Sequence, residues 1–263
     1  MKVGLKMKKI IAFLVLSSVL VLAIQHFSKN DNKIFEGEDI STEEQILIEE
    51  DNIVVKEKKI EIQEEFLMVD IIYPVFSGFN SANELNEEIE YKIQLSLNEA
   101  KDAESYNTEE RFDNSEEDLE SFKIIVSLET DYEYAIVGEL LSLRLNTYYY
   151  SGGAHPIYWI DSLNINTKTG ETILFEDIFK DKNASLNFIN EEILSEIDKD
   201  KDSYFEGYEE YINDLNGDLQ YYFEEDELVV YFGLYEITAY AYGMPEFRFE
   251  LDKIKGIINN IIN

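Results

Sequence analysis

Strand-like alternation of apolar and polar residues recurs in runs along this 263-residue chain, and three segments of helical period interrupt those runs. The strand-like runs cover about residues 54–63, 66–76, 122–128, 141–150, 159–165, 219–232 and 247–251, and the run 66–76 is apolar on both parities, as in a central strand. Apolar residues spaced by three and four fall at 82–100, 186–197 and 254–261. Because strands follow one another instead of alternating singly with helices, the order predicts an α+β fold with packed helices and mostly antiparallel sheets.

The first helix has the clearest signal. Ser81 and Glu84 form a capping box ahead of a regular apolar stripe. The acidic run that follows, residues 102–118, is expected to be a loop. In the strand near residues 141–150, one parity is apolar and the other is polar or aromatic, which predicts one polar face; that second set is Ser142, Arg144, Asn146, Tyr148 and Tyr150.

The N-terminus has the pattern of an export leader. Four lysines and no acidic residue occupy the first nine positions, and fifteen uncharged residues, Ile10–Ile24, follow. Residues 1–27 are either a retained single-span anchor, crossing the membrane through residues 10–27, or a signal peptide cleaved after Ala23. Either outcome places the rest of the chain outside the cytoplasm, attached to the cell membrane or secreted. Residues 28–51 are expected to be an acidic linker that allows a short helix at Thr42–Ile48.

Charge and composition exclude several functions. The chain has 56 acidic and 22 basic residues, a net charge of −34. Without the four leader lysines the charge is −38, from 18 basic and 56 acidic residues. Such a surface repels nucleic acid, because phosphate binding depends on Lys and Arg. The absence of Cys excludes disulfides, thiolate catalysis and Cys-based zinc sites.

Catalytic motifs are equally scarce. His155 is the one histidine outside the leader region, and neither a G-x-S-x-G elbow nor a phosphate-binding loop is present. Carboxylates are numerous enough for a glycosidase pair, but a sequence does not give their separation. We therefore expect a protein that is not an enzyme and has no cofactor.

One acidic run has the spacing of a calcium loop. Its carboxylates occupy the first, third, fifth and twelfth positions, at Asp198, Asp200, Asp202 and Glu209. The sixth position is Ser203, where the sharp turn of such a loop favours Gly. A solvated acidic loop at the end of a helix is the preferred interpretation, and calcium is the alternative.

Two loops rich in aromatic residues are the candidate binding surface. The first follows three tyrosines and contains paired glycines, which permit positive φ; its candidate residues are Ser151, Gly152, Gly153, His155 and Pro156. The second is long and poor in charge; its candidate residues are Tyr240, Tyr242, Gly243, Met244 and Pro245. Tyrosine is common in binding surfaces because it offers a large contact at low entropic cost. Turns that close the ends of the core are the structural alternative.

The same loops carry a family resemblance. The motifs YYYSGGAHP at residues 148–156, NTKTG at 166–170 and YEITAYAYGMPEF at 235–247 resemble an extracytoplasmic domain shared by RsiV-type anti-sigma factors and the non-catalytic part of PdaC-type peptidoglycan deacetylases. The resemblance implies two consecutive α+β subdomains, a PdaC-like one at 52–150 and an RsiV-like one at 151–263. Few residues precede the apolar run and a deacetylase's histidine pair is missing, so neither anti-sigma output nor catalysis is carried over.

The resemblance implies a binding module for lysozyme or another cationic protein of the cell envelope, and the negative charge would steer such a partner. The alternative is a module that binds cell-wall glycan or is structural in the envelope. It would use the rings of Tyr148, Tyr150, Trp159 and Tyr242 as stacking platforms.

Overall fold

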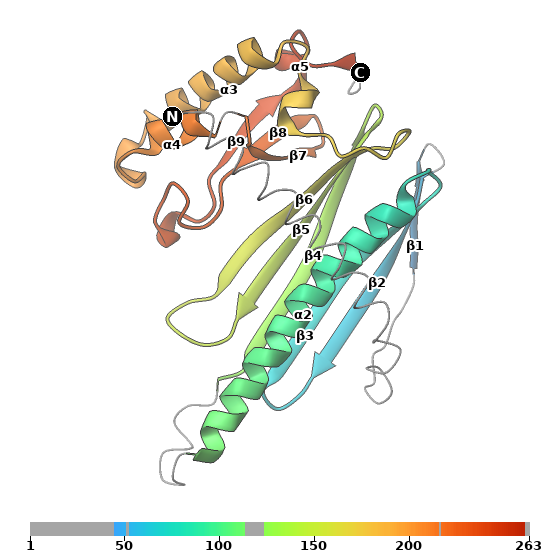
Figure 1. Ribbon diagram of the computed structural model, residues 1–263, viewed down its shortest axis with the longest axis vertical. Helices are drawn as coiled ribbons and strands as arrows, with labels where there is room; N and C mark the ends of the chain where they lie inside the picture. Colours follow the sequence, from blue (N-terminus) through green and yellow to red (C-terminus); the bar gives the residue numbers. More distant parts are fainter. Residues whose placement is uncertain (1–44, 51–52, 114–123, 216, 261–263) are drawn as a thin grey trace, which may run out of the picture. The chain divides into compact units, whose positions relative to one another are not determined.

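The computed structural model describes residues 45–50, 53–113, 124–215 and 217–260, and these form two β-sheets with helices packed against them (Figure 1). The α+β fold with mostly antiparallel sheets is therefore confirmed. None of the helices built from these residues is long and apolar enough to cross a membrane. The leader at residues 1–27, and the expected linker up to residue 44, lie outside the described residues.

The first sheet has six strands in chain order: β1 (Gln45–Glu50), β2 (Ile53–Gln63), β3 (Leu67–Ser77), β4 (Val126–Val137), β5 (Leu140–Tyr150) and β6 (Ile157–Asn166). Every neighbouring pair is antiparallel except β3 and β4, which run parallel and are joined through helix α2 (Ala82–Asp113). A parallel pair needs such a crossover because a tight turn only reverses the chain. The boundary expected after Tyr150 falls in the β5–β6 connection, so the first sheet extends to Asn166.

Helix α2 covers one face of this sheet (Figure 1). Its predicted apolar stripe is buried, with Ile89, Ile93 and Leu97 at most 2% exposed. Two contacts fix its orientation. The Tyr73 hydroxyl donates to Glu90 over 3.0 Å, and Lys92 forms an ion pair of 2.8 Å with Asp161 on β6. Apolar residues of β3, β4 and β5 on this side complete the core, which leaves the opposite face of the sheet to polar residues.

The expected loop at 102–118 is wrong for its first part, because α2 continues to Asp113. Residues such as Ala103, Glu104 and Glu109 favour helix without needing a buried face. The suggested helix at 42–48 is also wrong over its described part, since Gln45–Glu50 forms β1 and pairs with β2. Strand β4 begins at Val126 and runs on to Val137, further than the alternation ending at Leu128 predicted.

Pro74 stands near the end of the apolar run 66–76, where a proline indicates a strand edge or exit. Strand β3 pairs with β2 along its whole length, but its parallel pairing with β4 covers only Leu67–Ile71. Pro74 thus lies where the β4 side of β3 is unpaired, which suits a residue without an N–H donor.

The second half of the chain builds a sheet in the order β7 (Gln220–Glu224), β8 (Glu227–Tyr231) and β9 (Glu246–Glu250). Its helices are α3 (Lys182–Ile197), α4 (Tyr208–Asp214) and α5 (Leu251–Ile254), with short 3-10 turns η1 (Phe175–Ile178), η2 (Lys201–Ser203) and η3 (Tyr240–Tyr242). Helix α3 was predicted. Helix α4 was not predicted. The expected C-terminal helix at 254–261 is wrong, because α5 is a single turn that ends at Ile254.

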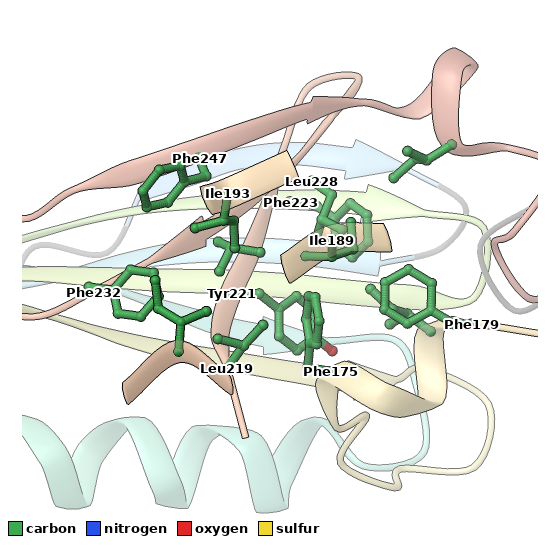
Figure 2. Packing of buried hydrophobic residues seen from close by; sticks show 14 of the residues in the cluster. Phe175, Phe179, Ile189, Ile193, Leu219, Tyr221, Phe223, Leu228, Phe232 and Phe247 are labelled. Carbon is green, nitrogen blue, oxygen red and sulfur yellow. The ribbon is translucent and has the colours of Figure 1, made fainter. Parts of the chain in front are cut away.

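A large aromatic and aliphatic core lies on one side of this sheet (Figure 2). Ile189 and Ile193 of α3 lie against Phe223 and Leu228 of the sheet. Phe175 packs edge-on against both Phe179 and Tyr221, with ring centroids 5.2 and 5.4 Å apart. The apolar face of α3 thus closes one side of the sheet, in the way that amphipathic helices usually do.

The other side of the second sheet contacts the first sheet. The Phe223 backbone N–H donates to the Ser142 hydroxyl over 2.8 Å, and the Asn164 side-chain amide donates to the Tyr221 carbonyl over 2.9 Å. Ser142 and Asn164 are buried polar residues, at most 4% exposed, so these bonds satisfy groups that would otherwise be costly to bury. The contact places the β8–β9 connection beside the β5–β6 loop.

Candidate binding site on the open sheet face

The structure brings the two predicted loops together as one aromatic cluster, formed by His155, Tyr158, Tyr235 and Tyr240. The His155 and Tyr240 rings stack at 3.7 Å between centroids and 21° between planes. The Tyr235 hydroxyl lies 3.0 Å from His155 Nε2, and Tyr158 meets Tyr240 edge-on at 6.0 Å. His155 and Tyr158 come from the first sheet, and Tyr235 and Tyr240 from the β8–β9 connection, so both halves build the cluster.

Glycines set the shape of both loops. Gly152 and Gly153 have φ values of +111° and +98°, as the paired glycines predicted. Gly243 has φ +75°, and a Cβ there would stand 3.1 Å from the Tyr158 hydroxyl oxygen. The Thr238 hydroxyl donates to the Gly243 carbonyl over 3.2 Å, and Phe232 N–H donates to the Pro245 carbonyl over 3.0 Å. The second loop is therefore tied to its own strand ends.

Two tyrosines of the second loop face solvent: Tyr242 is 59% exposed and Tyr235 is 52% exposed. Tyr240 is half-buried within the cluster, and this burial raises the pKa of its hydroxyl. Large exposed rings held on a tethered loop are suited to binding a partner with little loss of entropy.

Next to the cluster, the sheet face opposite α2 is hollowed into a cavity of about 440 Å³, which we call the acidic groove. It is lined by four carboxylates, two tyrosines and a methionine that the loop contributes: Asp70, Glu129, Asp131, Glu246, Tyr148, Tyr158 and Met244. Tyr158 belongs to both the cluster and the groove, so the two are one continuous surface. Tyr148 pairs with Glu129 on β4 and with Tyr158 on β6 in the register of the sheet.

The carboxylates of the groove differ in how they are neutralised. Asp70 forms an ion pair of 3.1 Å with Lys59. Glu246 forms an ion pair of 2.8 Å with Arg248. Asp131 accepts a hydrogen bond of 2.7 Å from the neutral amide of Asn146. The negative charge is thus least compensated at the middle of the groove.

A second hollow of about 710 Å³ adjoins the groove, and the two share Ile72, Asp131 and Arg144. Arg144 closes the groove at this end. Its guanidinium forms an ion pair of 2.9 Å with Glu133, lies 4.6 Å from the Tyr222 ring centroid and donates to the Tyr222 hydroxyl. Burial and the nearby Glu246 raise the pKa of Tyr222, so the hydroxyl keeps the proton that it donates to Glu246 over 2.9 Å.

The calcium candidates lie at the end of α3 and around η2. Asp198 forms an ion pair of 2.9 Å with Lys201, and Asp200 accepts a hydrogen bond of 2.6 Å from Ser203. Within the part of the chain that the structure describes, no three His, Asp or Glu side chains are grouped so that they could hold a metal ion. Each of the two carboxylates already has a partner within the loop.

Sequence reasoning missed Tyr158, Tyr235, Glu129 and Asp131. Tyr235 is the first residue of the motif at 235–247, but it is not among the candidate residues predicted for the second loop. The sequence around Glu129 and Asp131 does indicate a strand. Residues 129–134 alternate acidic residues with Thr or Tyr, as an exposed strand does. His155, the one histidine among the residues that the structure describes, forms hydrogen bonds through its two ring nitrogens with the Tyr235 hydroxyl and the Pro156 carbonyl, which makes it part of the loop contact.

The comparisons with known proteins agree with the motifs. Residues 60–158 match the family described as Deacetylase PdaC, and residues 176–252 match the family described as Protein of unknown function (DUF3298). No curated protein matches the chain.

The solved structures that are similar to this chain include two DUF3298 proteins. One is a DUF3298 family protein from Pseudomonas aeruginosa PAO1, with 14% identity, a TM-score of 0.48, and coverage of 86% of this chain and 97% of that chain. The other is a DUF3298 family member from Bacteroides fragilis NCTC 9343, with 18% identity, a TM-score of 0.46, and coverage of 78% and 94%. By its two family matches, the chain is similar to a PdaC-type domain over residues 60–158 and to a DUF3298 domain over residues 176–252.

Proposed function

We propose that this protein is a non-enzymatic binding module, held outside the cytoplasm, that captures lysozyme or another cationic protein of the cell envelope. The observation that carries the proposal is the continuous surface formed by the aromatic cluster and the acidic groove. A partner would contact the exposed rings of Tyr235 and Tyr242 while its positive charges face the groove carboxylates.

The chemistry of the surface supports this proposal over a catalytic one. Rigid aromatic anchors beside a charged region are typical of protein-binding surfaces. The net charge of −34 attracts a cationic partner over a distance and raises its association rate. Screening at physiological salt limits this attraction to about 8 Å, so close contacts with the rings must supply the lasting affinity.

The test is binding of the full-length chain, in mild detergent, to immobilised hen-type lysozyme at low and at physiological salt. Saturable binding that persists at physiological salt and lowers lysozyme activity is the expected result. The paired change Tyr240→Ala and Tyr242→Ala is expected to weaken binding at least tenfold. Binding that disappears at physiological salt would reduce the interaction to non-specific charge attraction and contradict the proposal.

A cell-wall glycan is the second candidate ligand, and the exposed rings of Tyr148 and Tyr242 favour it, since sugar faces stack on aromatic rings. Trp159 contributes less to this candidate, because its indole N–H donates to Asp161 on the side of the sheet that faces α2. The two functions differ in salt dependence: capture of a cation weakens with salt, and glycan stacking does not. Binding to purified cell wall that is unchanged between low and high salt would favour the glycan.

A further inference from the structure

The middle of the acidic groove has a regular spacing of charge. Glu129, Asp131 and Glu133 are alternate residues of β4, and their neighbours on β5 are Tyr148, Asn146 and Arg144. Alternate residues of a strand point to the same face and lie about 6.8 Å apart. This face is the one that α2 leaves uncovered, so the three carboxylates form an exposed row.

The described residues neutralise only part of this row. Glu133 has its ion pair with Arg144, while Asp131 has the neutral Asn146 amide as its partner. Glu129 forms no ion pair with any residue that the structure describes. Two adjacent negative charges therefore remain, at Glu129 and Asp131, on the floor of a cavity of about 440 Å³.

Two aromatic rings stand beside these charges. Tyr148 is the cross-strand neighbour of Glu129, and Tyr158 is the neighbour of Tyr148 on the next strand. The faces of tyrosine rings attract Lys and Arg side chains. A carboxylate with adjoining rings is thus complementary to a cationic side chain that also has an apolar stem.

The charge of the whole molecule limits what the occupant can be. A second copy of this chain brings another −34 charges and would be repelled. A nucleic acid is repelled for the same reason. Charge complementarity leaves a basic partner, and the spacing of the carboxylates matches an extended peptide whose alternate side chains are basic.

We propose that the acidic groove holds an extended basic segment of the captured protein, with Lys or Arg at alternate positions paired to Glu129 and Asp131 and lying over Tyr148 and Tyr158. This inference rests on the proposed function, since it names the part of the partner that the groove recognises. The loop tyrosines and the groove are then two separate contributions to one interface.

The test compares two full-length variants that lose the same charge. The groove variant carries Glu129→Gln and Asp131→Asn. The control carries Glu191→Gln and Glu192→Gln, which changes two exposed carboxylates of α3. The probes are hen-type lysozyme and a labelled peptide, Arg-Thr-Arg-Thr-Arg, with a citrulline version of that peptide as the uncharged probe. Circular dichroism melting curves check that both variants are folded.

At physiological salt, the groove variant is expected to bind the arginine peptide about tenfold more weakly, and the control within about twofold of the unchanged protein. The citrulline peptide is expected not to bind. Equal losses in the groove variant and the control would overturn the inference, because the attraction would then follow net charge alone. The inference would also be wrong if the citrulline peptide bound as tightly as the arginine peptide. It would be wrong, too, if a cationic chito-oligosaccharide bound in the groove more tightly than the arginine peptide.

The two proposals fail in different ways. If lysozyme binds both variants equally and only the loop change Tyr240→Ala with Tyr242→Ala weakens capture, the proposed function stands and the groove inference is wrong. If lysozyme is not captured but the arginine peptide binds in a way that requires Glu129 and Asp131, lysozyme capture is wrong and the groove inference stands.

Discussion

The Tyr222 hydroxyl is one of the groups that join the two sheets, and Tyr222→Phe is the sharpest test of its contribution to that contact. The hydroxyl accepts a hydrogen bond from Arg144 and donates one to Glu246. Tyr222 is 1% exposed, so water does not replace these bonds in the folded protein. The phenylalanine ring keeps its place over the guanidinium, so the substitution removes only the hydroxyl.

The expected loss can be worked out from the partners. A hydrogen bond to a charged group contributes about 1.5–3 kcal/mol to stability. Both charged partners retain other contacts, Arg144 with Glu133 and Glu246 with Arg248, which moderates the loss. We expect Tyr222→Phe to lower the free energy of unfolding by about 2 kcal/mol, within the range for charged partners.

Tyr221→Phe is the matched comparison, since the Tyr221 hydroxyl donates to a neutral acceptor, the Ile173 carbonyl, over 2.7 Å. Its expected loss is about 1 kcal/mol. Tyr242→Phe is the control, because this residue is 59% exposed, and its expected change is below about 0.5 kcal/mol.

The assay is equilibrium unfolding in urea, followed by circular dichroism. With a slope of about 2.5 kcal/mol per molar urea, a loss of about 2 kcal/mol lowers the midpoint by about 0.8 M. A loss for Tyr222→Phe that is smaller than that for Tyr221→Phe would show that the charged partners gain nothing from the hydroxyl, and the account of this contact would be wrong.

Three further predictions concern the core, the second loop and alkaline stability. Ile193→Ala, at a fully buried position of the core in Figure 2, is expected to cost about 3 kcal/mol in the same urea assay, and a loss below about 1 kcal/mol would contradict that packing. Gly243→Ala places a Cβ 3.1 Å from the Tyr158 hydroxyl at φ +75° and is expected to weaken lysozyme capture several-fold; Gly207→Ala, at φ +89° with no atom within 4 Å, is expected to leave capture unchanged, and equal effects would rule out the contact as the cause. Burial raises the pKa of Tyr231 to about 12, from about 10 in the unfolded chain, so the folded state keeps a proton that the unfolded state releases. Stability is therefore expected to fall as the pH rises from 10 to 12, and urea midpoints measured for Tyr231→Phe should fall less over that range.

The sequence predicted most of the strands and the two main helices because their buried faces are marked by apolar residues at regular spacing. It failed where polar residues form regular structure. The end of α2 up to Asp113 and the stretch of β4 from Glu129 to Tyr134 carry mostly acidic or aromatic residues, and acidic runs resemble loops when only apolar spacing is counted. The error matters for function, because Asp131 of the acidic groove lies in the missed part of β4.

The candidate loops were visible in the sequence, but their contact was not. Glycine, proline and tyrosine mark each loop locally, through backbone conformations and side chains that a sequence displays. His155 and Tyr240 are 85 positions apart, and nothing in their spacing predicts stacked rings. That contact results from β7 packing against β5 and β6, which involves the buried polar residues Ser142 and Asn164. Ser142 belongs to the polar parity of its strand, and that parity does not reveal that the residue is buried.

This arrangement links binding to the contact between the two sheets. The aromatic cluster draws two rings from the β5–β6 region and two from the β8–β9 connection, so its shape persists only while β7 stays against the first sheet. A ligand that contacts both loops favours the joined arrangement and stabilises it through its own binding energy. Under the proposed function, the buried bonds of Ser142, Asn164 and Tyr222 therefore act on recognition as well as on stability, because they hold the two parts of the candidate binding surface in register.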